Sequence, residues 1–401
     1  MSRWYSTRSR FGLAHAAAVL VSLTFLSGCM GGGGGGGNFD VSGTQPVTGE
    51  VLGSGTVKVG LILPLSANGN AGQIAKDMKN AADLAIRDFK TAGIQVLVKD
   101  DLGTVDGARA AATAAVAQGA QLILGPLFAQ SVTAVAQVAK PAHVPVVAFS
   151  TDSTTASPGV YLLSFLPQGD VDRIIAYASS KGRRSFAALL PDSAYGTLVE
   201  AELQRAVANA GGRVMSVERY ALDKTAMQAK ATVVAGLVKS GTVDAVFIPG
   251  GAQEAPFLAE IMAAAGVDSK KISYLGSGQW DDPAVASEST LDGGLYPSPD
   301  NSGFASFAQR YQAAFGAAPS RTATLAYDAT SLAAGLTARF GDQRFSEQTL
   351  TNPSGYIGLD GAFRFLSNGL NQRGLAVYQI ANGKAVLVDP APRTFAKAPG
   401  T

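Results

Sequence analysis

The chain has 401 residues, of which 47% are hydrophobic, and its formal net charge is +2. This length suffices for two domains with sizeable cores, and a nearly balanced charge gives no electrostatic footprint for nucleic acid. One cysteine and two histidines exclude a disulfide framework and a Cys/His nucleophile pair, and argue against a histidine-bearing zinc site. The composition therefore predicts a non-catalytic protein without metal or cofactor.

The N-terminal segment has the features of a secretory signal. A basic start precedes the apolar run from Phe11 to Leu26, which is too short for a transmembrane helix of about 20 apolar residues. Leu26-Ser27-Gly28-Cys29 follows and resembles the bacterial lipobox, in which cleavage precedes a cysteine that carries lipid. We predict a signal peptide over 1–28 and a lipidated Cys29 on the periplasmic side of the envelope. The alternative is an ordinary signal with a chance cysteine.

Residues 29–56 are predicted to be a linker. Seven consecutive glycines, Gly31 to Gly37, follow no strand and precede no Lys-Ser/Thr pair, so they indicate a flexible tether rather than a phosphate loop. Loss of residues 1–28 would lower the formal charge from +2 to −1. Met30, in place of an aspartate after the cysteine, favours outer-membrane anchoring under the enterobacterial sorting rule.

An alternation of strands and helices begins at Val57. Apolar runs of strand length alternate with segments of helical periodicity. In the first series we expect strands at 57–65, 94–99, 121–124 and 144–149, and helices at about 71–92, 105–118 and 131–140. In the second series we expect strands at 185–190, 213–220, 244–248 and 272–275, and helices at 170–181, from 195, at 227–239 and at 256–265.

Two such series predict two parallel-sheet lobes covered by helices, an α/β architecture. After Gly294 the pattern changes to two helical stripes, at 304–315 and 324–340. From Gly358 it changes again to hairpins, and Asn382-Gly383 is a strong turn signal between alternating strands. His143, the only histidine after the signal peptide, is interpreted as structural.

Candidate ligand residues lie where the strands end, because ligands of open α/β sheets bind at that edge. Three loops supply hydroxyls and helix N-termini that suit an anion, and the second lobe supplies aromatic side chains. Helix capping is the alternative role for the hydroxyls, and core packing is the alternative for the aromatic residues. The predicted ligand contacts are Ser66, Leu127, Ser150, Thr151, Ser153, Tyr195, Gly250 and Trp280.

Motifs across residues 57–390 resemble the type 1 periplasmic binding proteins, which include the leucine/isoleucine/valine-binding proteins. The resemblance is carried by 59–65, 123–127, Tyr195-Gly196, 315–319, 326–329 and 361–365. It implies two Rossmann-like lobes joined by three crossings, with a ligand held between them as they close. It assigns 57–166 and 295–354 to lobe 1, 167–294 and 355–390 to lobe 2, and leaves 391–401 as a loose tail.

The chain departs from this family at two ligand positions. Amino-acid binders carry a serine two residues after the leucine of Gly-Pro-Leu, and Ala129 stands there. They also carry an acid after a late strand, whereas residues 276–280 contain none. An ammonium buried without a counter-charge is costly, so a free branched-chain amino acid is disfavoured. The acids that could substitute are Asp192, Glu254 and Asp281.

A second resemblance concerns the penicillin-binding-protein activator lipoproteins, a branch of the same fold. It is carried by residues 125–127, 145–150, 159–165 and 275–283. It implies a non-catalytic lipoprotein that binds a small polar or carboxylate-bearing ligand and activates a peptidoglycan synthase by contact. The alternative is the substrate-binding subunit of an ABC importer for amino acids or related compounds, whose partner would be an ABC permease.

Overall fold

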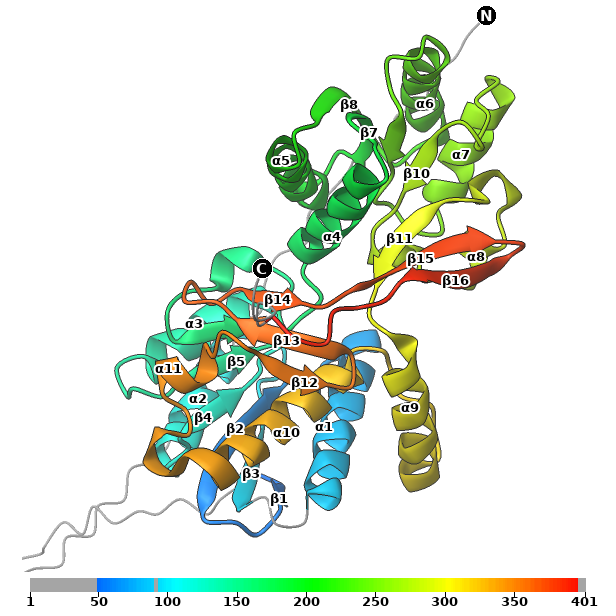
Figure 1. The fold of residues 1–401 in the computed structure, drawn as a ribbon. Coiled ribbons are helices and arrows are strands. Elements are labelled where there is room, and N and C mark those ends of the chain that lie inside the picture. The colour runs from blue at the N-terminus through cyan, green and yellow to red at the C-terminus, as the bar shows by residue number, and fades with distance from the viewer. Residues whose placement is uncertain (1–48, 90–92, 396–401) are drawn as a thin grey trace, which may run out of the picture. The chain divides into compact units, whose positions relative to one another are not determined.

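The computed structural model describes residues 49–89 and 93–395. Its first large sheet has six strands, parallel except for the short edge strand at its start (Figure 1). In sheet order they are β1 (Val51–Leu52), β3 (Ile94–Asp100), β2 (Val57–Leu63), β4 (Leu122–Leu124), β5 (Val146–Ala148) and β6 (Val160–Leu162).

Helices cover both faces of this sheet because its strands are apolar on both sides. Leu61 and Leu63 of β2 point into one core, whereas Ile62 points into the opposite one, as the alternation of strand side chains requires. The first core lies under α1 (Asn70–Asp88) and α10 (Ala323–Phe340), and the second lies under α2 (Val105–Ala117) and α3 (Ala129–Ala139).

The second large sheet has seven strands, of which the last two along the chain are antiparallel to their neighbours. In sheet order they are β16 (Lys384–Asp389), β15 (Ala376–Ala381), β11 (Leu295–Ser298), β10 (Ser273–Leu275), β9 (Ala245–Phe247), β7 (Ser185–Pro191) and β8 (Arg213–Tyr220). One face packs on α4 (Pro167–Ser180) and α5 (Ala194–Asn209), and the other packs on α6 (Lys224–Lys239) and α7 (Ala255–Ala264).

A three-stranded antiparallel sheet, β12 (Tyr356–Gly358), β13 (Gly361–Phe365) and β14 (Asn371–Arg373), joins the first large sheet. Phe363 and Phe365 enter the first core, and Asn371 Nδ2 donates to the carbonyls of Leu162 and Ser164 at 2.8 Å. Helix α9 (Asn301–Phe315) packs its aromatic stripe on α1 and α10. The remaining short helices are α8 (Pro283–Ala286) and α11 (Glu347–Leu350).

The chain passes between the large sheets at three places: after β6, after β11 and after β14. The second and third places differ from the expected boundaries at 294/295 and 354/355. Strand β11 belongs to the second sheet, and residues 356–373 pack on the first. Pro297 hides β11 from a pattern search, because proline argues against a strand. The hairpins before and after Gly374 have similar sequence patterns, so the sequence does not show that they belong to different sheets.

The ends of the described region also differ from expectation. The predicted linker ends in β1, which pairs with β3, and residues at the start of the predicted loose tail make contacts. Arg364 lies 4.8 Å over the Phe395 ring. The signal peptide, Cys29 and the glycine run lie outside the described residues, as does 396–401.

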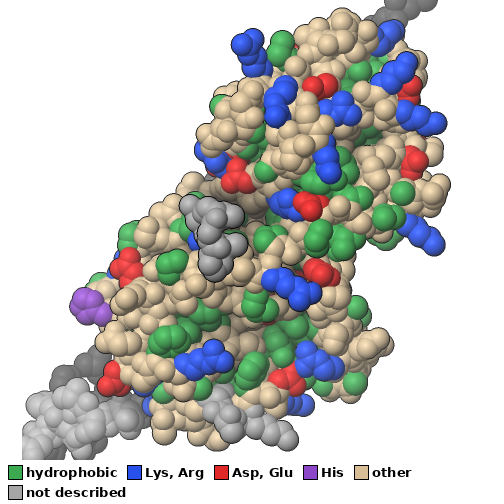
Figure 2. Space-filling model, viewed as in Figure 1, with side chains coloured by type: hydrophobic (Ala, Val, Ile, Leu, Met, Phe, Trp, Pro, Cys, Tyr) green, Lys and Arg blue, Asp and Glu red, His purple; other side chains and the backbone are tan. Residues whose placement is uncertain are grey.

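Charges on the protein surface are mixed. Lys and Arg side chains alternate with Asp and Glu over the face shown in Figure 2, without a large patch of one sign. Of the helices that the structure describes, none has the length and apolarity needed to cross a membrane.

Candidate functional site

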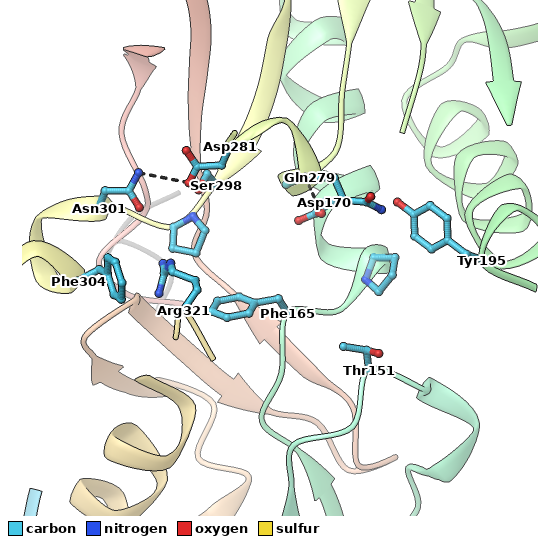
Figure 3. Close-up of a pocket in the computed structure, with 13 residues that line it drawn as sticks. Thr151, Phe165, Asp170, Tyr195, Gln279, Asp281, Ser298, Asn301, Phe304 and Arg321 are labelled. Carbon is cyan, nitrogen blue, oxygen red and sulfur yellow. Dashed lines mark hydrogen bonds between the residues drawn. The ribbon is translucent and has the colours of Figure 1, made fainter. Parts of the chain in front are cut away.

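A cavity of about 630 Å³ is bounded by elements of both large sheets and by the segments that connect them (Figure 3). Its polar and aromatic lining comes from five regions: the loop after β5, the start of α4 with the residues before it, the start of α5, the loop after β10, and the segment from β11 to α10. The lining residues are Thr151, Phe165, Pro167, Asp170, Tyr195, Gly278, Gln279, Asp281, Ser298, Pro299, Asn301, Phe304 and Arg321.

Local sequence explains how the second-lobe side chains reach the cavity. Pro167 starts α4, as proline favours the first helical position, and this places Asp170 in the first turn. Ser193 caps α5 by accepting from the Gly196 amide at 3.2 Å, so Tyr195 lies at the exposed start of that helix. The 3-10 turn Gly278–Trp280 after β10 presents Gln279.

Arg321 forms one wall, and most of its guanidinium is engaged within the protein. It pairs with Asp360, whose side chain is fully buried. Its centre lies 4.7 Å from the Phe304 ring and 5.2 Å from the Phe165 ring, within the range of a cation–π contact. Its Nη2 makes no hydrogen bond within the protein. Arg321 therefore joins the segments around the cavity and keeps one donor unpaired.

A buried charge cluster lies behind this wall. Arg373 Nε donates to the Ser164 carbonyl at 3.0 Å. Its guanidinium lies 4.7 Å from the Phe165 ring, which Arg321 also contacts. Burial lowers the pKa of Arg373, which the charges of Asp360 and Asp328 partly offset. Burial, together with the charge of Asp360, raises the pKa of Asp328 to about 7.

The cavity holds two carboxylates in different environments. Asp281 accepts hydrogen bonds from Ser298 Oγ at 2.9 Å and Asn301 Nδ2 at 3.3 Å. Asp170 accepts from the Gly278 amide at 2.8 Å, and burial raises its pKa to about 7 despite this bond. Among the described residues no group of three His, Cys, Asp or Glu side chains is placed to hold a metal ion.

Two of the eight predicted contacts, Thr151 and Tyr195, line the cavity. The Tyr195 hydroxyl donates weakly to the Pro249 carbonyl at 3.4 Å, and burial raises its pKa. The other six lie outside its wall. Ser66 is exposed, Leu127 packs against the first core, Ser150 Oγ accepts from the Asp152 amide, Ser153 starts a 3-10 turn, and Gly250 and Trp280 are buried.

The expectation that Trp280 contacts the ligand is corrected by its position. The indole is fully buried in the core under α6 and α7, and its Nε1 donates to the Gly250 carbonyl at 3.0 Å. It packs so closely on Gly276 that a Cβ there would lie 2.1 Å from the ring. The apolar ring is thus buried inside the second lobe, and its N–H is hydrogen-bonded there.

Of the three acids proposed to replace the missing carboxylate, only Asp281 reaches the cavity. Asp192 is exposed and lies 3.5 Å from Arg219, and Glu254 accepts from the Gly251 amide at 2.8 Å. Asp170, Phe304 and Arg321 were not predicted. Asp170 and Phe304 follow crossing segments and Arg321 precedes α10, and no local motif marks a residue that only tertiary structure brings to the cavity.

Comparisons with known proteins agree with this architecture. A periplasmic binding protein family model matches residues 56–385, and no curated protein sequence matches. Among solved structures, one described as a candidate branched-chain amino acid ABC transporter from Rhodospirillum rubrum has a TM-score of 0.74 at 18% identity, covering 83% of this chain and 99% of that one.

Two further structures show the same fold. A leucine-binding protein from Thermotoga maritima has a TM-score of 0.56 at 18% identity, with 84% of this chain and 98% of that one covered. A solute-binding protein of an ABC transporter from R. palustris, in complex with benzoate, has a TM-score of 0.56 at 20% identity, with 86% and 98% covered. With two helix-covered sheets, three connections and a cavity between them, the chain belongs to the type 1 periplasmic binding protein family.

Proposed function

We propose that this protein binds a small polar solute in the cavity and delivers it to an ABC importer in the membrane. The observation that carries the proposal is the cavity itself, which takes side chains from both lobes. A volume of about 630 Å³ lies within the range of small-molecule sites. The structural relatives named as ABC-transporter proteins favour import over the activation of a peptidoglycan synthase.

Activation of a synthase is the second candidate. It is supported by the resemblance of residues 275–283 to the penicillin-binding-protein activators, a segment that contains Gln279 and Asp281 of the cavity wall. Either function would use a tether to the envelope, and the Leu26-Ser27-Gly28-Cys29 pattern supports lipidation of Cys29. Affinity capture from solubilised membranes separates the two candidates: an ABC permease supports import, and a penicillin-binding protein supports activation.

Blocking the cavity is expected to abolish solute binding. Thr151 lines the cavity, so the Thr151→Trp variant should fill it and weaken binding at least tenfold, measured by titration calorimetry against a panel of amino acids, aromatic acids and amines. Thr113→Trp, on the exposed face of α2, is the matched control and should bind as the unmodified protein does. A panel without any binding to the unmodified protein contradicts the proposal.

A further inference from the structure

Given the proposed function, we propose that the solute is a small organic cation whose primary ammonium is bound by Asp170. The ammonium would be attached to an apolar or aromatic group that packs against the rings lining the cavity. This differs from a free amino acid or an aromatic carboxylate, which some structural relatives hold. The inference rests on three features: the net charge of the cavity lining, the hydrogen bonding of Asp170 and the small charge compensation that an anion would find.

The charge of the cavity is negative once internal pairs are accounted for. Its charged lining residues are Asp170, Asp281 and Arg321. Arg321 is paired with the buried Asp360 and lies against two phenylalanine rings, and even when its charge is counted in full, two carboxylates face one guanidinium. A solute that enters this space therefore meets uncompensated carboxylates, and a cation gains most from that field.

Asp170 has no cationic partner among the described residues. Its one hydrogen bond comes from the Gly278 amide to Oδ2, which leaves Oδ1 free. The titratable groups around it are Tyr195 on α5, with Glu254 behind that tyrosine, and Asp281 and Arg321 across the cavity. A carboxylate that is half-buried in a cavity wall is stabilised by a counter-charge. A ligand ammonium would supply that charge, and the ring of Tyr195 in the cavity wall also favours a cation.

A ligand carboxylate would meet less charge compensation than a ligand ammonium. Ala129, at the start of α3, has no hydroxyl, and Ser66, Leu127 and Ser150 are absent from the cavity wall. Arg321, the one cation of the lining, pairs with the buried Asp360, and its Nη2 makes no hydrogen bond within the protein. A carboxylate bound there would compete with Asp360 for that charge, and Asp170 and Asp281 would repel it.

The test compares solutes that share an apolar body and differ in the charged group attached to it. Leucine without its carboxylate is 3-methylbutylamine, and leucine without its ammonium is 4-methylpentanoate; benzylamine and benzoate form a second matched pair. Calorimetry at pH 8 should show binding of one or both amines, with each carboxylate at least tenfold weaker. Preferential binding of the carboxylates overturns the inference but leaves the proposed function intact. Equal binding of an amine and its matched carboxylate does the same, whereas a silent panel contradicts both.

A variant assigns the effect to Asp170. Asp170→Asn should weaken amine binding at least tenfold, whereas Asp172→Asn, on the same helix but paired with Arg205 at 2.7 Å, should leave it unchanged. An equal effect of the two variants, or none of Asp170→Asn, overturns the assignment. Circular dichroism spectra verify that both variants are folded.

The pH profile of the unmodified protein tests the same assignment without a mutation. Because an ammonium prefers the ionised carboxylate and the pKa of Asp170 is about 7, the ionised fraction limits the apparent affinity. Amine binding should therefore be about tenfold weaker at pH 6 than at pH 8. Affinity that does not change between these pH values overturns the role of Asp170.

Discussion

Replacement of Arg373 by methionine is expected to lower the free energy of unfolding by about 2–3 kcal/mol, because it removes a charged hydrogen bond to the Ser164 carbonyl. Arg373 is nine-tenths buried, and the charges of Asp360 and Asp328 act on it. Methionine keeps an unbranched apolar stem but is shorter and uncharged, so the two buried carboxylates lose a nearby positive charge. The measurement is urea denaturation followed by far-ultraviolet circular dichroism at pH 8.

The pH dependence of this loss has a definite sign. The pKa of Asp328 is raised to about 7 in the folded state, above its unfolded value, so the stability that its proton provides is lost as the pH rises from about 4 to 7. Removing Arg373 raises that pKa further. The destabilisation should therefore be smaller at pH 5 than at pH 8, because at pH 5 the carboxyl is protonated.

The matched control for Arg373→Met is Arg213→Met. Arg213 is exposed at the start of β8, and substitutions at such sites change stability by less than about 0.5 kcal/mol. Equal, small effects of the two substitutions would show that the buried cluster contributes no net stability. The comparison also tests whether the buried charge of Arg373 stabilises the packing around Phe165.

Replacement of Trp280 by alanine is expected to lower the free energy of unfolding by about 3–5 kcal/mol. The indole is fully buried and packs on Gly276 and Gly294, where even a Cβ would collide with it. Alanine leaves a cavity beside these glycines. Because glycine has no side chain, neither residue can fill the vacated space. It also leaves the Gly250 carbonyl without the indole N–H, and an unpaired buried acceptor adds to the loss.

Denaturation followed by circular dichroism measures this loss too, with Phe340→Ala as the control. Phe340 is 42% exposed at the end of α10, so its removal should change stability far less. A small effect of Trp280→Ala would mean that the second lobe closes over the vacated space. Solute binding to any Trp280 variant that folds should be retained, because the indole lies outside the cavity wall.

The fold was largely predictable because hydrophobic periodicity is a local signal. The strands predicted at 57–65 and 94–99 are β2 over 57–63 and β3 over 94–100, and the helices between strands lie within a few residues of their predicted bounds. Strand β11 was missed because Pro297 lies in it. The small sheet β12–β14 was placed in the wrong lobe, because a hairpin pattern does not say against which core its apolar face packs.

The candidate site was far less predictable. Strand-end loops drew attention to Thr151 and Tyr195, which line the cavity, but equally to Ser150, whose hydroxyl caps its own loop. Asp170 lies in the first turn of α4, where an acid is ordinary helix chemistry. Its significance comes from the Gly278 loop, which lies 108 residues away along the chain. Arg321 likewise depends on Asp360, and no spacing rule joins them.

The burial of Trp280 in one lobe has a spectroscopic consequence. It is the only tryptophan among the described residues, and it lies in the core of the second sheet. In a chain without residues 1–28, tryptophan emission would report the melting of that lobe alone, whereas circular dichroism reports both. Coincident curves from the two signals would identify a single cooperative transition. Separate curves would show that the lobes are independent folding units joined by the three connections.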